Sequence, residues 1–391
     1  MSSPSTISSY MTNRELRATI SLSCIFMLRM LGLFMIMPVF SIYAKTIKGG
    51  DNVIFVGLAL GAYGLTQSLL YIFYGLASDR FGRKPVISIG LLIFSIGSFI
   101  SAYANHIVWI IVGRIIQGMG AVSSAVLAFI ADLTSEQNRT KAMAIVGGSI
   151  GVSFAIAMIG GPILFQWFGM RSLFMLIGVL SMLSIGIIIW IVPDSKKRPY
   201  TSTPFSEVLS NIDLQRLNFS VLTLHATQTV LFLIIPRMLV DFGLPVTSHW
   251  KVYFPIMGVS FILIVPAIII AENFKKIKLL LLVGIASVLT SQLLLIIKPH
   301  SILTILFILF LYFLGFNLLE ALQPSIVSKL APGASKGAAI GVYNTTQSIG
   351  LALGGIVGGY LLKHDGSNVV FLACSVLVLF SLINTIGIKH F

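Results

Sequence analysis

Charged side chains are scarce in this 391-residue sequence, because Asp, Glu, Lys and Arg together make up only 10% of it and 57% of the residues are hydrophobic. Soluble globular proteins carry about 25% charged residues. The scarcity argues against a water-soluble enzyme and against a nucleic-acid-binding protein. At ~20 apolar residues per membrane-spanning helix, the length allows about ten to thirteen spans.

Cysteine and acidic residues are also few. The two cysteines, Cys24 and Cys374, lie in apolar runs at opposite ends of the sequence, so neither a disulfide framework nor a thiolate metal site is indicated. Only 12 Asp and Glu accompany 26 Lys and Arg, which gives a net charge of +14. Such a balance is typical of nucleic-acid binding, of anionic lipid binding or of membrane topology.

Long apolar runs separated by Gly, Pro and charged residues predict twelve spans. The polar stretch 194–214 divides them six and six, which predicts an N-terminal half over 1–193, a cytoplasmic linker over 194–214 and a C-terminal half over 215–391. The predicted fold class is therefore an all-α membrane protein of two six-helix halves. The predicted spans are 18–43, 54–78, 85–104, 107–132, 140–165, 170–193, 215–241, 250–271, 277–297, 302–329, 336–362 and 367–388.

The distribution of basic residues predicts the orientation of these spans. With the N-terminus in the cytoplasm, 17 Lys and Arg fall on cytoplasmic segments, six on outside segments and three within spans. Cytoplasmic loops of membrane proteins carry such an excess of Lys and Arg. An even number of spans then places both termini in the cytoplasm, and most of the positive charge is explained by topology.

One short connection, residues 75–84, carries the most informative motif, Gly-Leu-Ala-Ser-Asp-Arg-Phe-Gly-Arg-Lys. A basic loop alone would only satisfy the topology rule. We expect Gly75 to allow a close helix approach and Gly82 to supply the turn before the third span. Asp79 is expected to reach a neighbouring helix N-terminus or to pair with Arg83.

The whole string resembles the loop signature of the major facilitator superfamily, G-x-L-a-D-r-x-G-r-k. Residues 114–118, Arg-Ile-Ile-Gln-Gly, are similar to that family's R-x-x-q-G element in the fourth span. In the fifth span a glycine-and-proline motif resembles that of the family's antiporters, with ordinary small-residue packing as the alternative. The residues of this motif are Gly147, Gly151, Gly161 and Pro162.

The sequence resembles the YajR-type group of drug/proton antiporters, with two departures. That group carries a small soluble domain after its last span, whereas this sequence ends at Phe391, just beyond the twelfth span. Many drug/proton antiporters place an acidic residue in the first span, where this sequence has Arg29. The second departure weakens the expectation of a cationic drug as the substrate.

The resemblance implies that spans 1, 4, 7 and 10 line a central cavity. Ionisable residues within spans are costly and tend to face cavities or partners. Glu320 is the only carboxylate well inside a predicted span, and Asn317 and Gln323 lie one turn away on either side. The four cavity spans each carry one such residue: Arg29, Arg114, His225 and Glu320.

Two of these residues are candidates for proton coupling. Glu320 is the first, and the alternative is a static pair with Arg29 or His225. His225 is the second, with a hydrogen-bonded packing role as the alternative. The substrate-cavity candidates, for which structural pairing or packing is the alternative, are Arg29, Arg114, Gln117, Asn317 and Gln323, and weaker candidates are Gln67, Gln228, Asn344 and Gln347.

The resemblance also implies a conformational latch at the cytoplasmic side, which would loosen when a proton or substrate binds and let the halves rock. A static set of paired charges capping helix ends is the alternative. The latch candidates are Gly75, Asp79, Arg80, Gly82, Arg83 and Asp132.

The resulting functional hypothesis is a monomeric secondary transporter of the bacterial inner membrane that exports a small molecule in exchange for protons. Neither a cofactor, a metal nor a nucleic-acid partner is expected, and no phosphate-binding loop or catalytic set indicates an enzyme. One alternative is a symporter or facilitator of an anionic, zwitterionic or sugar-like metabolite, because the spans carry a net positive charge. Another is a non-transporting sensor or scaffold on the same fold.

Overall fold

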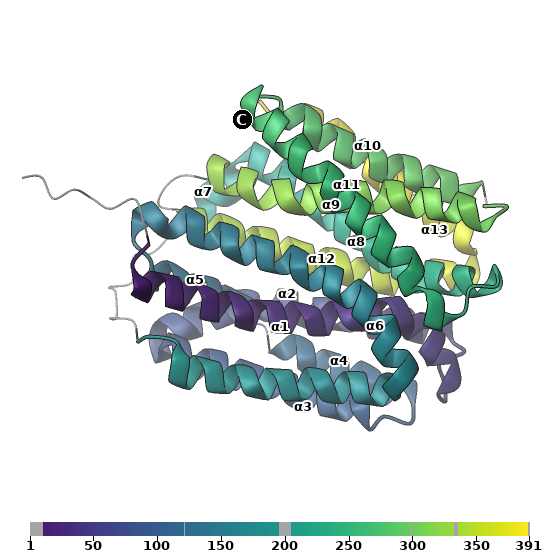
Figure 1. The fold of residues 1–391 in the computed structure, drawn as a ribbon, viewed down its shortest axis with the longest axis horizontal. Helices are drawn as coiled ribbons and strands as arrows, with labels where there is room; N and C mark the ends of the chain where they lie inside the picture. The colour runs from purple at the N-terminus through teal and green to yellow at the C-terminus, as the bar shows by residue number, and fades with distance from the viewer. Residues whose placement is uncertain (1–10, 121, 195–204, 298, 332–334, 390–391) are drawn as a thin grey trace, which may run out of the picture.

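A computed structural model describes residues 11–120, 122–194, 205–297, 299–331 and 335–389, and within these ranges the chain is helical apart from short connections (Figure 1). The helices begin at strong N-terminal signals; α1, for example, starts with a capping box between Thr12 and Glu15. The helices are α1 (Asn13–Tyr43), α2 (Val53–Phe81), α3 (Arg83–Ala102), α4 (Ile107–Met119), α5 (Ser123–Leu133), α6 (Glu136–Gly186), α7 (Phe205–Ser210), α8 (Ile212–Asp241), α9 (Trp250–Asn273), α10 (Ile277–Ile296), α11 (Ile302–Leu330), α12 (Lys336–His364) and α13 (Ser367–Ile386).

The helices follow the predicted spans with three differences. The fourth predicted span is broken into α4 and α5, since α4 ends at Met119 and α5 begins at Ser123. The fifth and sixth predicted spans are two helical segments of α6 that meet without a loop at a kink at Gly169, where the φ of +71° is not helical. The linker contains the short helix α7, and the predicted basic residues Lys196, Lys197 and Arg198 lie outside the described residues.

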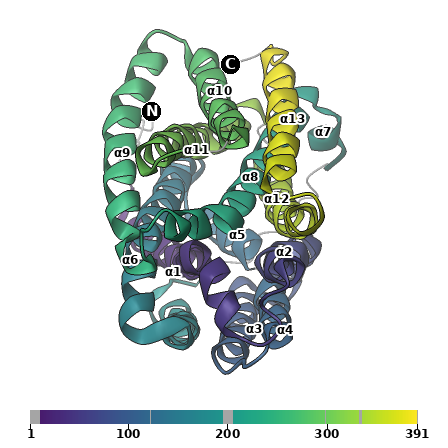
Figure 2. The same cartoon turned by 90° about the vertical axis from the view of Figure 1, so that its right-hand side faces the viewer.

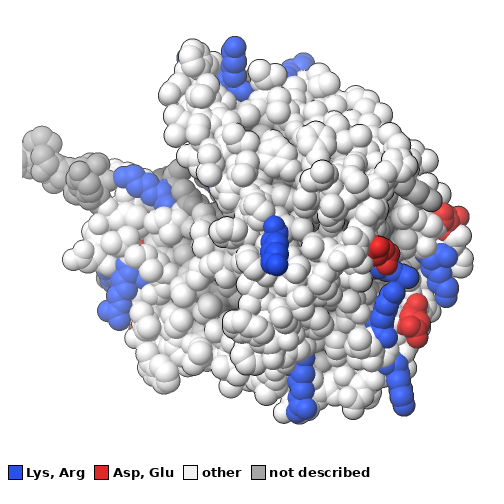
Figure 3. All heavy atoms as spheres, turned by 45° about the vertical axis from the view of Figure 1, so that its right-hand side comes forward, with Lys and Arg blue, Asp and Glu red and all other residues white. Residues whose placement is uncertain are grey.

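Among the described residues, ten helical stretches are long and apolar enough to cross a membrane. The stretch Gln137–Ile191 corresponds to two predicted spans, and the glycine-rich α12 is not among the ten. The arrangement is therefore consistent with twelve crossings. The face shown in Figure 3 is mostly uncharged, as expected for a surface in contact with lipid.

The helices form two bundles that lie one above the other in Figure 2. In the N-terminal half, α1 packs against α6, and α3 packs against α4 and α6; in the C-terminal half, α10 packs against α11 and α13. The first turn of α1 and the end of α13 lie at the same end of the molecule (Figure 1). We call this the cytoplasmic end, after the predicted topology, and the opposite end the outer end.

The two halves meet most extensively where α2 lies beside α12. Glycines allow the backbones to approach closely there, because a Cβ atom added at Gly57 would lie only 2.2 Å from the carbonyl oxygen of Gly355. One added at Gly64 would lie 2.5 Å from the carbonyl oxygen of Ser348. Since α2 begins and α12 finishes at the outer end, this contact closes the outer end.

Candidate substrate and proton site

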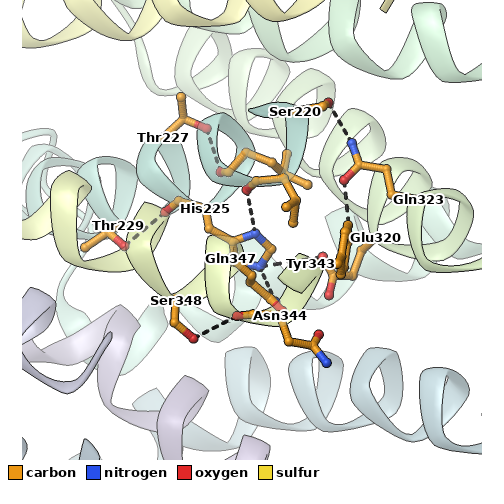
Figure 4. A network of polar contacts seen from close by, with 12 residues as sticks. Ser220, His225, Thr227, Thr229, Glu320, Gln323, Tyr343, Asn344, Gln347 and Ser348 are labelled. Atoms are coloured by element: carbon orange, nitrogen blue, oxygen red, sulfur yellow. Dashed lines mark hydrogen bonds and ion pairs between the residues drawn. The ribbon is translucent and has the colours of Figure 1, made fainter. Parts of the chain in front are cut away.

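In the C-terminal half, a polar cluster surrounds His225 of α8. Its Nδ1 atom lies 3.1 Å from the carbonyl oxygen of Val221, and its Nε2 atom lies 2.7 Å from Nε2 of Gln347 on α12. Oε2 of Glu320, on α11, lies 3.6 Å from the same Nε2 atom. Figure 4 shows the imidazole ring between the Gln347 and Glu320 side chains. The structure therefore brings together the two predicted proton-coupling candidates.

The Glu320 carboxyl is an ion-pair partner of His225 only at long range. A separation of 3.6 Å is too long for a hydrogen bond, and Oε2 is buried without any hydrogen-bond partner. The Glu320 side chain is 16% exposed, whereas that of His225 is 1% exposed. The Glu320 side chain is thus the part of the pair that remains partly accessible.

The two amides that flank Glu320 along α11 have different partners. Gln323 donates from Nε2 to Oγ of Ser220 at 2.8 Å and accepts from the Tyr343 hydroxyl at 3.2 Å, so it joins α8, α11 and α12 (Figure 4). Asn317 points to the sulfur of Met257 on α9, at 3.5 Å. Gln323 therefore extends the cluster around Glu320, and the contact found for Asn317 leads to a different neighbour.

In the N-terminal half, Arg29 of α1 is 3% exposed, and its hydrogen bonds to described residues are with neutral groups. It donates to the hydroxyl of Ser123, at the start of α5, and from Nη2 to the hydroxyl of Tyr63 on α2 at 2.7 Å. Within the part of the chain that the structure describes, no ion pair joins Arg29 to Glu320. Of the two static pairs considered for Glu320, the structure shows the one with His225.

Arg114 of α4 belongs to the same half and is 2% exposed. It donates to the carbonyl oxygen of Ala59 at 3.3 Å and to Oε1 of Gln117 at 2.9 Å, and Gln117 in turn donates to Oγ of Ser98 at 2.7 Å. Its guanidinium carbon lies 4.8 Å from the centre of the Tyr63 ring. The structure thus connects Arg114 with Gln117 inside the N-terminal half.

The predicted latch residues form an ion-pair cluster around Arg83. Its Nη1 atom lies 2.6 Å from Oδ1 of Asp79 and its Nε atom 2.8 Å from Oδ2 of Asp132, so the ends of α2, α3 and α5 are tied together. Nη1 also donates to the hydroxyl of Ser78 at 2.6 Å. The pairing of Asp79 with Arg83 is as predicted, and all members of this cluster belong to the N-terminal half.

Three other residues of the loop motif lie as follows. Gly82 has φ of +99°, a conformation that side chains disfavour, and it ends α2 as predicted. Arg80 stacks over the Phe81 ring at 5.4 Å. The close helix approach expected at Gly75 is wrong for this structure, because a Cβ atom there would be 4.0 Å from Oγ of Ser124, an ordinary contact distance.

The glycine-and-proline motif of α6 divides into two parts. An added Cβ atom at Gly161 would lie 2.6 Å from the carbonyl oxygen of Met35, so this glycine, beside Pro162, lets α6 pack closely on α1. Cβ atoms added at Gly147 and Gly151 would meet no atom within 4 Å. Only the part of the motif near Pro162 is therefore used for close packing.

Sequence reasoning missed a set of contacts at the cytoplasmic end. Glu15 accepts from the backbone N–H of Ser135 at 2.7 Å, just before α6, and the Thr12-x-x-Glu15 capping spacing was a signal for its role. Asp194 pairs with Lys84 at 2.7 Å. The hydrogen bond and the charge of Lys84 lower the pKa of Asp194. These contacts tie the ends of α1, α3 and α6 to the start of the linker.

The fold and the site define a class: an α-helical membrane protein whose two halves enclose buried ionisable residues. The Major Facilitator Superfamily model matches residues 22–355. The chain therefore belongs to the major facilitator superfamily of membrane transporters, as the loop motif predicted.

Individual relatives agree with this assignment. The chain is 42% identical over 373 residues to the inner membrane transport protein YajR of Escherichia coli, covering 94% of this chain and 82% of that protein. It is 27% identical to multidrug resistance protein 2 of Bacillus subtilis, covering 85% of each chain. A bacterial homologue of the human lysosomal transporter Spinster, crystallised in an inward-facing and occupied conformation, has the same fold, with a TM-score of 0.74 at 14% identity over 96% of this chain and 97% of that one.

Proposed function

We propose that this protein is a proton-coupled exporter of small organic molecules in the bacterial inner membrane and that Glu320 and His225 form its proton-binding site. The observation that carries the proposal is the partly exposed Glu320 side chain, whose buried Oε2 atom lacks a hydrogen-bond partner among the described residues and lies 3.6 Å from His225. An ionised carboxylate is costly within a membrane unless a partner compensates it. A carboxyl without a fixed partner is therefore suited to exchange a proton.

The surroundings of Glu320 support a link between protonation and conformation. His225 lies on α8, Gln347 on α12 and Glu320 on α11, so a proton arriving at the carboxyl changes the contacts between three helices. Of these, α12 forms the close contact with α2 of the other half. A rearrangement around Glu320 would therefore reach the interface that closes the outer end.

Export is supported by the relatives, whose printed names describe inner membrane transport and multidrug resistance. Another relative, 26% identical, is the quinolone resistance protein NorA of Staphylococcus aureus. A quinolone such as norfloxacin is therefore a suitable first compound in a screen. The proposed direction is outward, with protons moving inward.

The test is a proton-flux assay in everted membrane vesicles that contain the wild-type protein or the Glu320→Gln variant. We expect added compound to drive proton movement in the wild type and to lose this effect in the variant, because an amide cannot carry the proton. Glu272→Gln is the matched control, since Glu272 is 54% exposed and only 3.9 Å from Lys329 near the end of α9. Undiminished compound-driven flux in Glu320→Gln would contradict the assignment.

A further inference from the structure

The N-terminal half contains two buried guanidinium groups without an acidic partner. Arg29 and Arg114 are 3% and 2% exposed, and among the described residues the ion pairs involve neither of them. Both face the same neutral ring, since the guanidinium carbons lie 6.0 Å and 4.8 Å from the centre of Tyr63. A buried charge normally requires a partner of opposite charge, so both guanidinium groups are suited to receive a negative group.

Arg29 differs from Arg114 in a way that identifies where the negative group belongs. The Nε atom of Arg29 is buried and has no hydrogen-bond partner. All the contacts found for its Nη atoms are with hydroxyl groups, those of Ser123 and Tyr63. The Arg114 guanidinium, in contrast, already donates to an amide oxygen and a backbone carbonyl. Arg29 therefore retains an unused donor.

The partner of Arg29 lies at a helix N-terminus. Ser123 is the first residue of the 11-residue helix α5, which begins where the fourth predicted span is broken near its middle. The first turn of α5 contains no acidic residue, and its N–H groups and helix dipole favour a negative charge. In transporters, half-helix N-termini near the membrane midplane point at anionic substrate groups.

The same place borders the interface between the halves. The helix α5, which begins at Ser123, contacts α12 of the C-terminal half, the helix that carries Asn344. Asn344 is three residues from Gln347, which contacts His225. The Arg29–Ser123 contact therefore lies on helices that pack against the C-terminal half, α1 against α8 and α5 against α12.

We infer that the transported substrate carries an acidic group, and that Arg29 binds this group together with Ser123 at the N-terminus of α5. The inference rests on the proposed transport function and specifies its substrate class: organic anions, or zwitterions with a carboxylate or a similar acid. The substrate would supply the negative charge that Arg29 lacks. To bind Arg29, the acidic group must displace the hydroxyl groups that now contact the guanidinium. A charged acceptor favours this exchange, because its hydrogen bonds are stronger than those of a neutral hydroxyl.

The test is equilibrium binding to the purified full-length protein in detergent, without a proton gradient. The probes are matched acids, amides and amines on phenyl and naphthyl scaffolds, for example 2-naphthoate, 2-naphthamide and 2-naphthylmethylammonium. We expect the acid to bind the wild type at least ~10-fold more tightly than the amide and the amine, and Arg29→Gln to remove this preference. Arg29→Lys, which keeps the charge, should retain part of it.

Arg171→Gln is the control, because Arg171 stacks over Tyr103 at 4.3 Å, away from Arg29, and should leave the preference intact. If Arg29→Gln does not fold, loss of the preference in Ser123→Ala, with its thermal unfolding midpoint retained, supports the same conclusion. Equal binding of the three probes by the wild type, no binding of any, or an unchanged preference in folded Arg29→Gln would overturn the inference. Because no proton movement is measured, failure here is distinct from failure of Glu320 as the proton site.

Discussion

Replacing Gly57 with Ala should open the outer end of the protein. The added Cβ atom would lie 2.2 Å from the carbonyl oxygen of Gly355 and 2.8 Å from Cα of Gly359, and both of these are backbone atoms that cannot rotate away. To reach a tolerable contact, α2 and α12 would have to separate by at least about 0.8 Å. Overpacking of this kind costs ~1–3 kcal/mol, and the cost falls only on the conformation in which the two helices touch. The conformation with a closed outer end should therefore become ~5–150-fold less favoured.

The assay is a distance measurement between spin labels at Asn52→Cys and Lys363→Cys, with Cys24 and Cys374 replaced by Ser. These two positions report on the outer end, because Nζ of Lys363 donates to Oδ1 of Asn52 at 3.4 Å across the interface. We expect Gly57→Ala to move the distance distribution towards longer values. Gly341→Ala is the matched control on α12, since its added Cβ atom would meet nothing within 4 Å. Identical distributions for the two alanine variants would refute the reasoning.

Two further predictions concern the cytoplasmic end. Arg83→Gln should lower the thermal unfolding midpoint and expose the ends of α2 and α5 to thiol reagents, because it leaves Asp79 and Asp132 without their partner. The same change at Arg80, which stacks on Phe81, should have little effect. Equal effects of the two variants would count against the latch. Because Lys84 lowers the pKa of Asp194, this ion pair is present above the usual carboxyl pKa of about 4 and is lost as the pH falls through the lowered value. Lys84→Gln should therefore lower the thermal unfolding midpoint slightly at neutral pH. The difference between the variant and the wild type should vanish on acidification. A difference that grows in acid would contradict the assignment.

The overall fold could be predicted from the sequence because lipid imposes a simple rule. A chain that crosses a membrane must satisfy its backbone hydrogen bonds within each span, so long apolar runs report helices directly. The break in the fourth predicted span was not predictable, because the run 107–132 contains no proline and the glycines near its middle are equally typical of close helix packing. The boundary between the fifth and sixth predicted spans, in contrast, agrees with the structure, because the positive φ of Gly169 interrupts α6 between them.

The sequence predicted which residues form the candidate site better than it predicted which residues contact each other. Glu320 and His225 stood out because ionisable residues are rare within spans, and the structure places them together. The choice of Tyr63 and Ser123 as partners of Arg29 was not predictable, because hydroxyl groups within helices are common and mostly bond to their own backbone. Which residues of two halves face each other depends on tertiary packing, which spacing along one helix does not encode.

Proteoliposomes containing the purified protein test most directly whether Glu320 couples substrate movement to protons. Two rates are measured for the same compound: accumulation driven by an imposed proton gradient, and exchange of labelled for unlabelled compound without a gradient. We predict that Glu320→Gln abolishes gradient-driven accumulation and retains exchange, because exchange needs only the substrate site and alternating access. Gradient-driven accumulation that persists in this variant at the wild-type rate would contradict the account.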